Sequence, residues 1–296
     1  MGLKQFLYLP QKRKERKVIY HMETRAEICK SQPTNSNPQS ASQIYVGVDV
    51  GASRTKVAIL DSDKKLIGHA VKKSGTDFAG VAGICLDSSL TMANAEEKNI
   101  SCTISTGYGR KNVFFAKETK TEIGCHAKGC YHYFSIPMSI IDIGGQDNKV
   151  IKLDKKGRRT GFKMNRKCAA GTGAFLEEMC PRLNIALENM NELALQSEDM
   201  VKLGSFCTVF SATEVLENIR QGKKVPDIVK GLFFSVIKRV LEMDSLTENV
   251  VMTGGVVAHN PFLVKMTEGI IGRTIFVPEY PQLTGAIGAA LYAMES

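Results

Sequence analysis

The fold is decided by the stretch IYVGVDVGASRTKVAILD, which occupies residues 44–61. Apolar and largely β-branched residues fill 44–48 and again 57–60, so both segments are predicted strands. Glycine and hydroxyl residues lie between them, which is typical of a tight turn. We therefore expect a β-hairpin whose turn covers residues 50–56, with Asp49 at the end of its first strand.

The same pattern recurs near mid-chain as SIIDIGGQDNKVIKLD, residues 139–154. An internal repeat at this spacing predicts two related lobes. Each turn follows an aspartate, Asp49 or Asp142, and contains glycines whose backbone N–H groups can approach a phosphate closely. The sequence therefore predicts a duplicated α/β fold with two lobes around a nucleotide cleft, although capping of a strand end is an alternative role for both aspartates.

A third element is NVVMTGGVVAHN, residues 249–260, a predicted strand that enters a Gly254-Gly255 turn ahead of a helix near Pro261. Such a turn lets a flat base lie against the backbone. The sequence has no GxxxxGK[ST] motif, and its first two glycine turns join strand to strand, which argues against a Walker loop and a Rossmann fingerprint. The three elements in this order resemble those of the actin, hexokinase and Hsp70 superfamily of ATP-binding folds.

Two of the eight cysteines, Cys168 and Cys207, lie where a predicted helix begins. Pro181 is expected to end the first of these helices. Unpaired N–H groups and the helix dipole stabilise a thiolate or an anionic iron–sulfur core at such a position. Neither cysteine has a CxxC partner, so a metal site with two ligands from this chain would need a second chain.

The remaining cysteines carry weaker signals. Cys125-His126 and Cys130-Tyr131-His132 suggest metal binding, yet their spacing completes no set of four ligands. Eight cysteines without a secretory signal favour a reducing compartment, so we expect a cytoplasmic protein.

Five segments make the resemblance more specific: STGYGR at 105–110, DIGGQD at 142–147, KCAAGTG at 167–173, CTVF at 207–210 and MTGGV at 252–256. Together they resemble the activator component of 2-hydroxyacyl-CoA dehydratases. This family of CoA-substrate-specific enzyme activases is related to the ATPase subunits of benzoyl-CoA reductase, the BadF/BadG/BcrA/BcrD-type ATPases. The resemblance covers about residues 44–294.

The resemblance implies a homodimer that shares one [4Fe-4S] cluster, with Cys168 and Cys207 of each chain as its ligands. It also implies that ATP binding and hydrolysis change the angle between the helices at that cluster. A low-potential electron would pass from ferredoxin or flavodoxin through the cluster to a 2-hydroxyacyl-CoA dehydratase, which carries out the dehydration.

Roles for the nucleotide-site residues follow from the two hairpins and the resemblance. Asp49 and Asp142 are expected to hold hydrated Mg²⁺, which keeps several waters and takes one or two carboxylates. Gln146 is the candidate to orient the attacking water. The remaining candidates form the first phosphate loop (Ala52, Ser53, Arg54, Thr55, Lys56), the second phosphate loop (Gly144, Gly145) and the nucleoside contact (Gly254, Gly255, Asn260).

Two positions depart from the family pattern. Arg166 stands where the family has aspartate, and Ala212 stands where it has glutamate. Both changes add positive charge near the predicted cluster, which should favour its reduced state and raise its potential.

The chain carries a net charge of +9, and residues 1–43 supply +5 of it. This leader is polar, basic and rich in Pro, Ser and Asn, so we expect it to be disordered, with lobes at 44–136 and 137–296. Two alternatives for this leader stay open. Translation would start at Met22, or the basic residues would form an arm that anchors the protein to an anionic surface. Because the charge is concentrated there, and no apolar run is long enough for a membrane span, we expect neither nucleic acid nor membrane as a partner.

Two other functions stay open. The first is an ATPase subunit of a benzoyl-CoA-type reductase, which would co-purify with its catalytic subunits. The second is a kinase or a nucleotide-binding module of the same fold with structural cysteines, although no residue is placed as a kinase's catalytic base.

Overall fold

The structure is a computed structural model, and it describes residues 43–165, 168–204 and 207–296. The predicted leader, apart from Gln43, and Arg166 lie outside the described residues.

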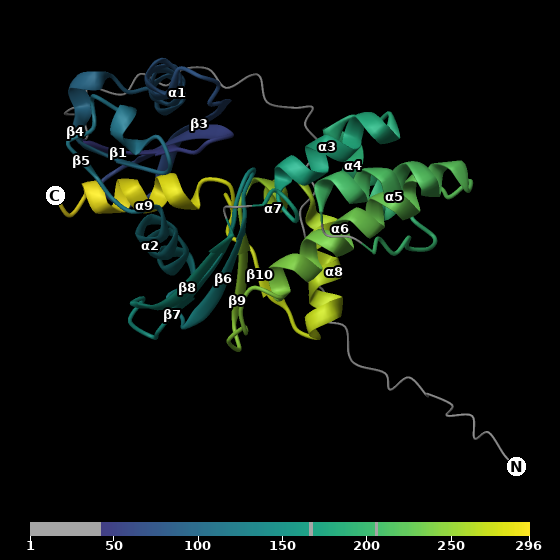
Figure 1. The fold of residues 1–296 in the computed structure, drawn as a ribbon. Coiled ribbons are helices and arrows are strands. Elements are labelled where there is room, and N and C mark those ends of the chain that lie inside the picture. Colours follow the sequence, from purple (N-terminus) through teal and green to yellow (C-terminus); the bar gives the residue numbers. More distant parts are fainter. Residues whose placement is uncertain (1–42, 166–167, 205–206) are drawn as a thin grey trace, which may run out of the picture. The chain divides into compact units, whose positions relative to one another are not determined.

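Two five-stranded sheets form the framework (Figure 1). The first has the strand order β3-β2-β1-β4-β5 and the second the order β10-β9-β6-β7-β8. The first sheet consists of β1 (Ile44–Val50), β2 (Arg54–Leu60), β3 (Leu66–Lys73), β4 (Ile100–Thr106) and β5 (Glu118–Thr119). The second consists of β6 (Met138–Ile143), β7 (Asn148–Leu153), β8 (Arg159–Asn165), β9 (Val250–Thr253) and β10 (Ile275–Phe276).

The two sheets are built alike. In each, the first three strands are antiparallel neighbours and the last two run parallel to the first. The registers also agree, because Asp49 lies opposite Lys56 on β1 and β2, and Asp142 lies opposite Lys149 on β6 and β7. The internal duplication predicted from the sequence is therefore confirmed.

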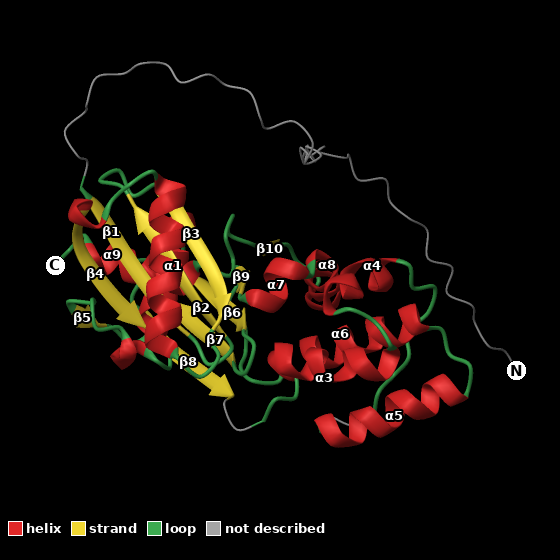
Figure 2. Ribbon diagram, turned by 90° about the horizontal axis from the view of Figure 1, so that it is seen from above, coloured by secondary structure: helices red, strands yellow, loops and turns green. Residues whose placement is uncertain are grey.

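Helices cover both faces of the first sheet. Val57 and Ile59 of β2 pack with α1 (Phe78–Ala93), whereas Ala58 and Leu60, which point the other way, pack with α9 (Thr284–Ala293). Figure 2 shows α1 lying across this sheet. The last helix of the chain thus belongs to the core of the first sheet, while the predicted lobe boundary at 136/137 stays a prediction.

Helix α9 also contacts α2 (Glu122–Phe134) very closely. A Cβ added to Gly288 of α9 would lie 1.8 Å from the Cys125 carbonyl oxygen of α2. Only glycine allows the two backbones to approach so closely.

The remaining helices lie with the second sheet: α3 (Gly173–Leu183), α4 (Met190–Leu195), α5 (Thr208–Arg220), α6 (Val225–Leu241), α7 (Gly255–His259) and α8 (Pro261–Ile271). Short 3₁₀ helices cover Glu97–Asn99, Arg110–Asn112 and Leu187–Asn189. Helix α6 buries its apolar stripe in the largest hydrophobic core. Among the described residues, no helix combines the length and apolarity needed to cross a membrane.

One predicted helix end is wrong. Pro181 does not terminate α3, which continues to Leu183 and ends with Asn184 in the left-handed conformation. A proline removes one helix hydrogen bond, but Cys180 and Leu183 are buried in the core at this point. Packing of the last turn therefore outweighs the lost hydrogen bond.

Candidate functional site

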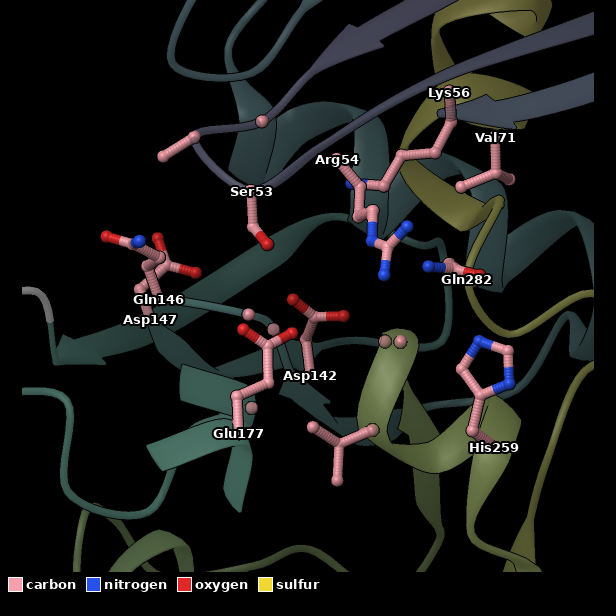
Figure 3. A pocket seen from close by; sticks show the side chains of 18 of the residues that line it. Ser53, Arg54, Lys56, Val71, Asp142, Gln146, Asp147, Glu177, His259 and Gln282 are labelled. Carbon is pink, nitrogen blue, oxygen red and sulfur yellow. The ribbon is translucent and has the colours of Figure 1, made fainter. Parts of the chain in front are cut away.

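A cavity of about 790 Å³ lies where the hairpin turns of the two sheets meet α3 and α7. Figure 3 shows Ser53 and Arg54 pointing into it from the first hairpin, with Asp142 and Glu177 facing them. Its lining includes most of the predicted nucleotide residues: Ala52, Ser53, Arg54, Lys56, Asp142, Gly144, Gly145, Gln146, Gly254, Gly255 and Asn260. Asp49 and Thr55 are buried and do not line the cavity.

The two turns have the same backbone geometry and touch each other. The Gly51 N–H donates to the Arg54 carbonyl over 3.1 Å, and the Gly144 N–H donates to the Asp147 carbonyl over 2.9 Å. A Cβ on Gly145 would lie 2.7 Å from the Cβ of Ser53. The second turn therefore needs glycine at this position to approach the first.

The duplication places one lysine–aspartate pair under each turn. Lys56 Nζ lies 3.0 Å from Asp49 Oδ2, and Lys149 Nζ lies 3.1 Å from Asp142 Oδ2. Both pairs follow from the shared register, because each lysine stands directly across the hairpin from its aspartate. Sequence reasoning assigned a role to Lys56 and missed Lys149, although both lysines follow their aspartate by seven residues.

Lys149 is the centre of a buried charge cluster. Its Nζ also lies 2.9 Å from Glu122 Oε1 and 2.6 Å from Asp147 Oδ1, and the residue is only 2% exposed. Burial alone would lower the pKa of this ammonium, but the charges of Asp142, Glu122 and Asp147 raise it above its usual range. Lys149 therefore stays charged and compensates three carboxylates at the floor of the cavity.

Asp142 has partners on both oxygens. Thr253 Oγ1 donates to Oδ1 over 2.8 Å, and His126 Nδ1 lies 3.7 Å from the same oxygen. Burial favours the neutral acid, but the charges of His126 and Lys149 and the hydrogen bonds from Thr253 and Lys149 hold the pKa of Asp142 well below its ordinary value. Asp142 is therefore a carboxylate, and contact with a cation would go through water or require a partner to move.

Asp49 differs from Asp142 in one respect. Its Oδ1 is buried and has no hydrogen-bond partner among the described residues. A buried unpaired carboxylate oxygen is costly, so this atom fits a water molecule or a hydrated cation as its partner.

The third predicted turn lines the cavity beside the second hairpin. Gly254 has a φ of +102°, and a Cβ there would lie 2.3 Å from the Ile143 carbonyl oxygen, so the position requires glycine. His259 and Gln282 line the cavity beside it (Figure 3). Sequence reasoning missed both, and also Glu177, because no motif marks them.

The cysteine at the start of α5 lies where the sequence predicts, and Cys168 lies further from its helix. Cys207 is exposed and directly precedes α5. Cys168 is half-buried and lies four residues before Thr172, the residue that precedes α3, because Ala169–Thr172 forms a turn. Helices α3 and α5 pack against each other. Among the described residues, no group of three or more His, Cys, Asp or Glu side chains is placed to hold a metal ion.

The segment that carries Cys168 is hydrogen-bonded to the second phosphate hairpin. The N–H groups of Gly173 and Ala174, at the start of α3, donate to the carbonyls of Gly144 and Gly145 over 2.9 and 2.7 Å. Asn148 Nδ2 donates to the Gly171 carbonyl over 2.7 Å. A displacement of the second turn would therefore be transmitted to the Cys168 segment.

The two cysteine–histidine pairs that suggested metal binding, Cys125-His126 and Cys130-Tyr131-His132, lie on α2. Cys125 and Cys130 are buried in α2, and burial raises the pKa of Cys125 to about 12 and that of Cys130 well above its usual value. His126 lines the cavity, where its Nδ1 is 3.3 Å from Thr284 Oγ1. These thiols are therefore unreactive core residues, and His126 belongs to the cavity.

Comparison with known proteins gives consistent results. The model of the BadF/BadG/BcrA/BcrD ATPase family matches residues 46–293. The activator of lactoyl-CoA dehydratase from Anaerotignum propionicum is 42% identical over 254 residues, which is 85% of this chain and 97% of that protein. The solved activator of the 2-hydroxyisocaproyl-CoA dehydratase from Clostridium difficile, with bound ADPNP, has a TM-score of 0.81 at 38% identity and covers 86% of this chain and 95% of that chain.

A more distant structure confirms the fold class alone. A ROK family glucokinase from Streptomyces griseus has a TM-score of 0.52 at 12% identity and covers 86% of this chain and 100% of that chain. The two lobes are thus those of actin/hexokinase-like ATPases, as the three predicted turns indicated.

Proposed function

Because the chain belongs to the BadF/BadG/BcrA/BcrD ATPase family, we propose that it is the ATP-driven activator of a 2-hydroxyacyl-CoA dehydratase. The observation that carries the proposal is the hydrogen-bonded connection from the second phosphate hairpin to the segment of Cys168. Such a connection lets the state of the nucleotide alter the position of a redox ligand. Similarity to relatives that are named dehydratase activators supports the same conclusion.

The nucleotide would lie along the cavity. Its phosphates would bind Ala52, Ser53, Arg54 and Lys56 of the first turn and Gly144–Gln146 of the second, and its nucleoside would lie near Gly254, Gly255 and Asn260. Gln146 would orient the attacking water. A family relative binds ADPNP, which agrees with this assignment.

A hydrated Mg²⁺ fits this site. Asp49 is buried and does not line the cavity, so its Oδ1, which has no partner among the described residues, would contact the ion through an intervening water, whereas Lys149, Thr253 and His126 occupy the oxygens of Asp142. Asp49 and Asp142 would therefore hold the ion mainly through water molecules. The ion would neutralise charge on the β- and γ-phosphates.

The chemistry of Cys168 and Cys207 fits an iron–sulfur cluster. Cys168 Sγ accepts a hydrogen bond from the Ala170 N–H over 3.4 Å, and Cys207 lies at the start of α5, where the helix dipole favours anionic sulfur. One [4Fe-4S] cluster bound by both cysteines of two chains would carry one electron from ferredoxin or flavodoxin to the dehydratase. The exposed apolar side chains of Val209, Phe210 and Leu216 on α5 support a homodimer at this place.

The two departures from the family pattern have different structural settings. Ala212 is 6% exposed and packs in the core under α5, so a glutamate there would need a partner for its charge. Arg166 lies outside the described residues. We propose that both changes raise the cluster potential by adding positive charge or removing negative charge nearby.

The test is iron and acid-labile sulfide per dimer after anaerobic purification, for wild type, Cys168→Ala and Cys207→Ala. About four irons per dimer are expected in the wild type, with loss in either variant. Cys102→Ala, at a buried thiol, is the matched control and should keep the iron. A dimer without iron that still binds ATP would refute the electron-transfer role and favour a kinase or binding module.

A further inference from the structure

The charge of the folded part of the chain is concentrated in one segment. The chain carries +9 and the leader +5, so residues 44–296 carry +4. Residues 155–176 contain seven Lys or Arg and no Asp or Glu, so the rest of residues 44–296 carries −3. Five of these cations, Lys155, Lys156, Arg158, Arg159 and Lys163, lie in the turn between β7 and β8 and on β8 itself, and we call this group the basic hairpin.

All five cations of the basic hairpin are exposed, and none forms an ion pair with a carboxylate of the described residues. Asp154 at the start of the turn accepts hydrogen bonds from the backbone N–H groups of Lys156 and Arg158, so it shapes the turn and leaves their side chains available. Asp244, whose pKa is lowered mainly by a hydrogen bond from Lys152 and also by nearby Lys163, is paired with Lys152 at 2.9 Å. The basic hairpin is therefore a net positive surface that the nearby charges of Asp154 and Asp244 offset only in part.

The basic hairpin also offers apolar and backbone contacts. Phe162 is 46% exposed, and the guanidinium of Arg159 lies 5.2 Å from the centre of its ring. Strand β8 is at the edge of its sheet, so one side of its backbone is not paired with another strand of the described residues (Figure 1). Aromatic and arginine side chains of this kind are typical of protein interfaces.

Protection of an exposed sheet edge is the alternative explanation for these charges. The duplicated fold provides an internal comparison, because β3 is the equivalent edge of the first sheet. The turn before β3 together with β3, residues 61–73, contains two aspartates and four lysines, a net charge of +2, whereas the matching residues 154–165 contain one aspartate and five cations, a net charge of +4. The edge of the second sheet therefore carries two positive charges more than the equivalent edge of the first sheet.

We propose that the basic hairpin is the docking surface for the acidic electron-donor protein. This inference rests on the proposed function for the donor's role, and it adds where the donor binds and what surface it presents. Strand β8 leads directly toward Cys168, and Asn165 at its end donates from Nδ2 to the Cys168 carbonyl over 3.3 Å. A donor bound along β8 would thus approach one of the cluster ligands.

The dimensions are compatible with this placement. Seven residues of β8 extend roughly 20 Å at about 3.3 Å per residue. A stable interface covers about 800 Å² on each partner, a patch roughly 30 Å across. A single small protein can therefore contact the turn lysines and still reach the end of β8.

The experiment measures binding of an acidic ferredoxin to the full-length, cluster-loaded dimer at about 50 and 200 mM salt. Two charge-reversal variants, Lys155→Glu/Lys156→Glu and Arg159→Glu/Lys163→Glu, should each weaken binding at least about 10-fold at low salt. The control Lys64→Glu/Lys65→Glu makes the same charge change at the equivalent turn of the first sheet and should stay within about 2-fold of wild type. Arg159→Lys/Lys163→Arg should retain binding, because it preserves the charges.

The outcomes separate this inference from the proposed function. Iron content and ATP hydrolysis should be the same in all variants as in the wild type. A wild-type protein that contains no iron or hydrolyses no ATP would count against the proposed function alone. Equal ferredoxin binding by the wild type and both hairpin variants would overturn the docking surface. A hairpin that binds a short DNA duplex instead of ferredoxin would also overturn it. If Arg159→Glu/Lys163→Glu aggregates, the turn variant Lys155→Glu/Lys156→Glu still decides the question, because it leaves the edge strand unchanged.

Discussion

The charge cluster around Lys149 permits a quantitative test of how the second phosphate hairpin is held. Replacing Lys149 with methionine keeps a long side chain and removes the charge that compensates Glu122, Asp142 and Asp147. Removal of one partner from a buried ion pair costs about 3–5 kcal/mol. Because Lys149 is 2% exposed and has three partners, we expect a loss of this size, which lowers Tm by about 6–20 °C.

The loss should depend on pH. The folded-state pKa of Asp142 is depressed, so its ionisation stabilises the wild type above the unfolded pKa of about 3.9, and this contribution disappears only as pH falls through the lower folded value. Without Lys149 the pKa of Asp142 rises, and protonation then relieves repulsion among the carboxylates. The difference between variant and wild type should therefore be larger at about pH 7 than at about pH 5.

The assay is urea denaturation followed by circular dichroism at both pH values, with Lys56→Met as the control. Lys56 has one carboxylate partner, Asp49, at 3.0 Å, and its side chain is 17% exposed, so we expect a smaller loss of about 1–3 kcal/mol. The double variant Asp142→Asn/Lys149→Met should be more stable than the sum of the two single losses predicts. A Lys149→Met protein within about 1 kcal/mol of wild type, or no less stable than Lys56→Met, would refute this account of the hairpin.

Three further outcomes follow from particular contacts. Gly288→Ala should prevent stable folding, since its Cβ would lie 1.8 Å from the Cys125 carbonyl oxygen. Gly83→Ala, in open space within α1, should instead raise the free energy of unfolding by about 0.5–1 kcal/mol. Thermal unfolding of both variants checks these two outcomes. In cluster-free protein, iodoacetamide should modify exposed Cys207 well before Cys125, whose pKa burial raises to about 12, and mass spectrometry at about pH 8 would show the order. Gln146→Ala should lower kcat for ATP hydrolysis by about 100-fold with little change in ADP affinity, and an unchanged kcat would remove Gln146 from the reaction.

Local patterns in the sequence were sufficient for the hairpins and their turns. The glycine turns at 50–56 and 143–149 depend on conformations and close approaches that few residues other than glycine permit, so their position can be read directly. The structure shows the same register in both hairpins, with each lysine directly opposite its aspartate. The family followed from the five segments at 105–110, 142–147, 167–173, 207–210 and 252–256, because their residues and order are specific to it.

Other features depend on contacts between distant parts of the chain. The end of α3 was predicted wrongly because a proline is a local signal, while burial of Cys180 and Leu183 depends on the core that α3 joins. The return of α9 to the first sheet leaves no local mark on the sequence beyond small residues such as Gly288.

The sequence by itself determined the class of fold and the order of its turns, and it singled out Cys168 and Cys207 as candidate ligands. Each of these conclusions rests on residues that are adjacent in the chain. Only the tertiary structure showed that Glu122, Asp142 and Asp147 surround Lys149. It alone showed that α3 is hydrogen-bonded to the second phosphate turn. The physical reason is that burial and charge compensation arise between segments brought together by folding, and no local pattern encodes which segments meet.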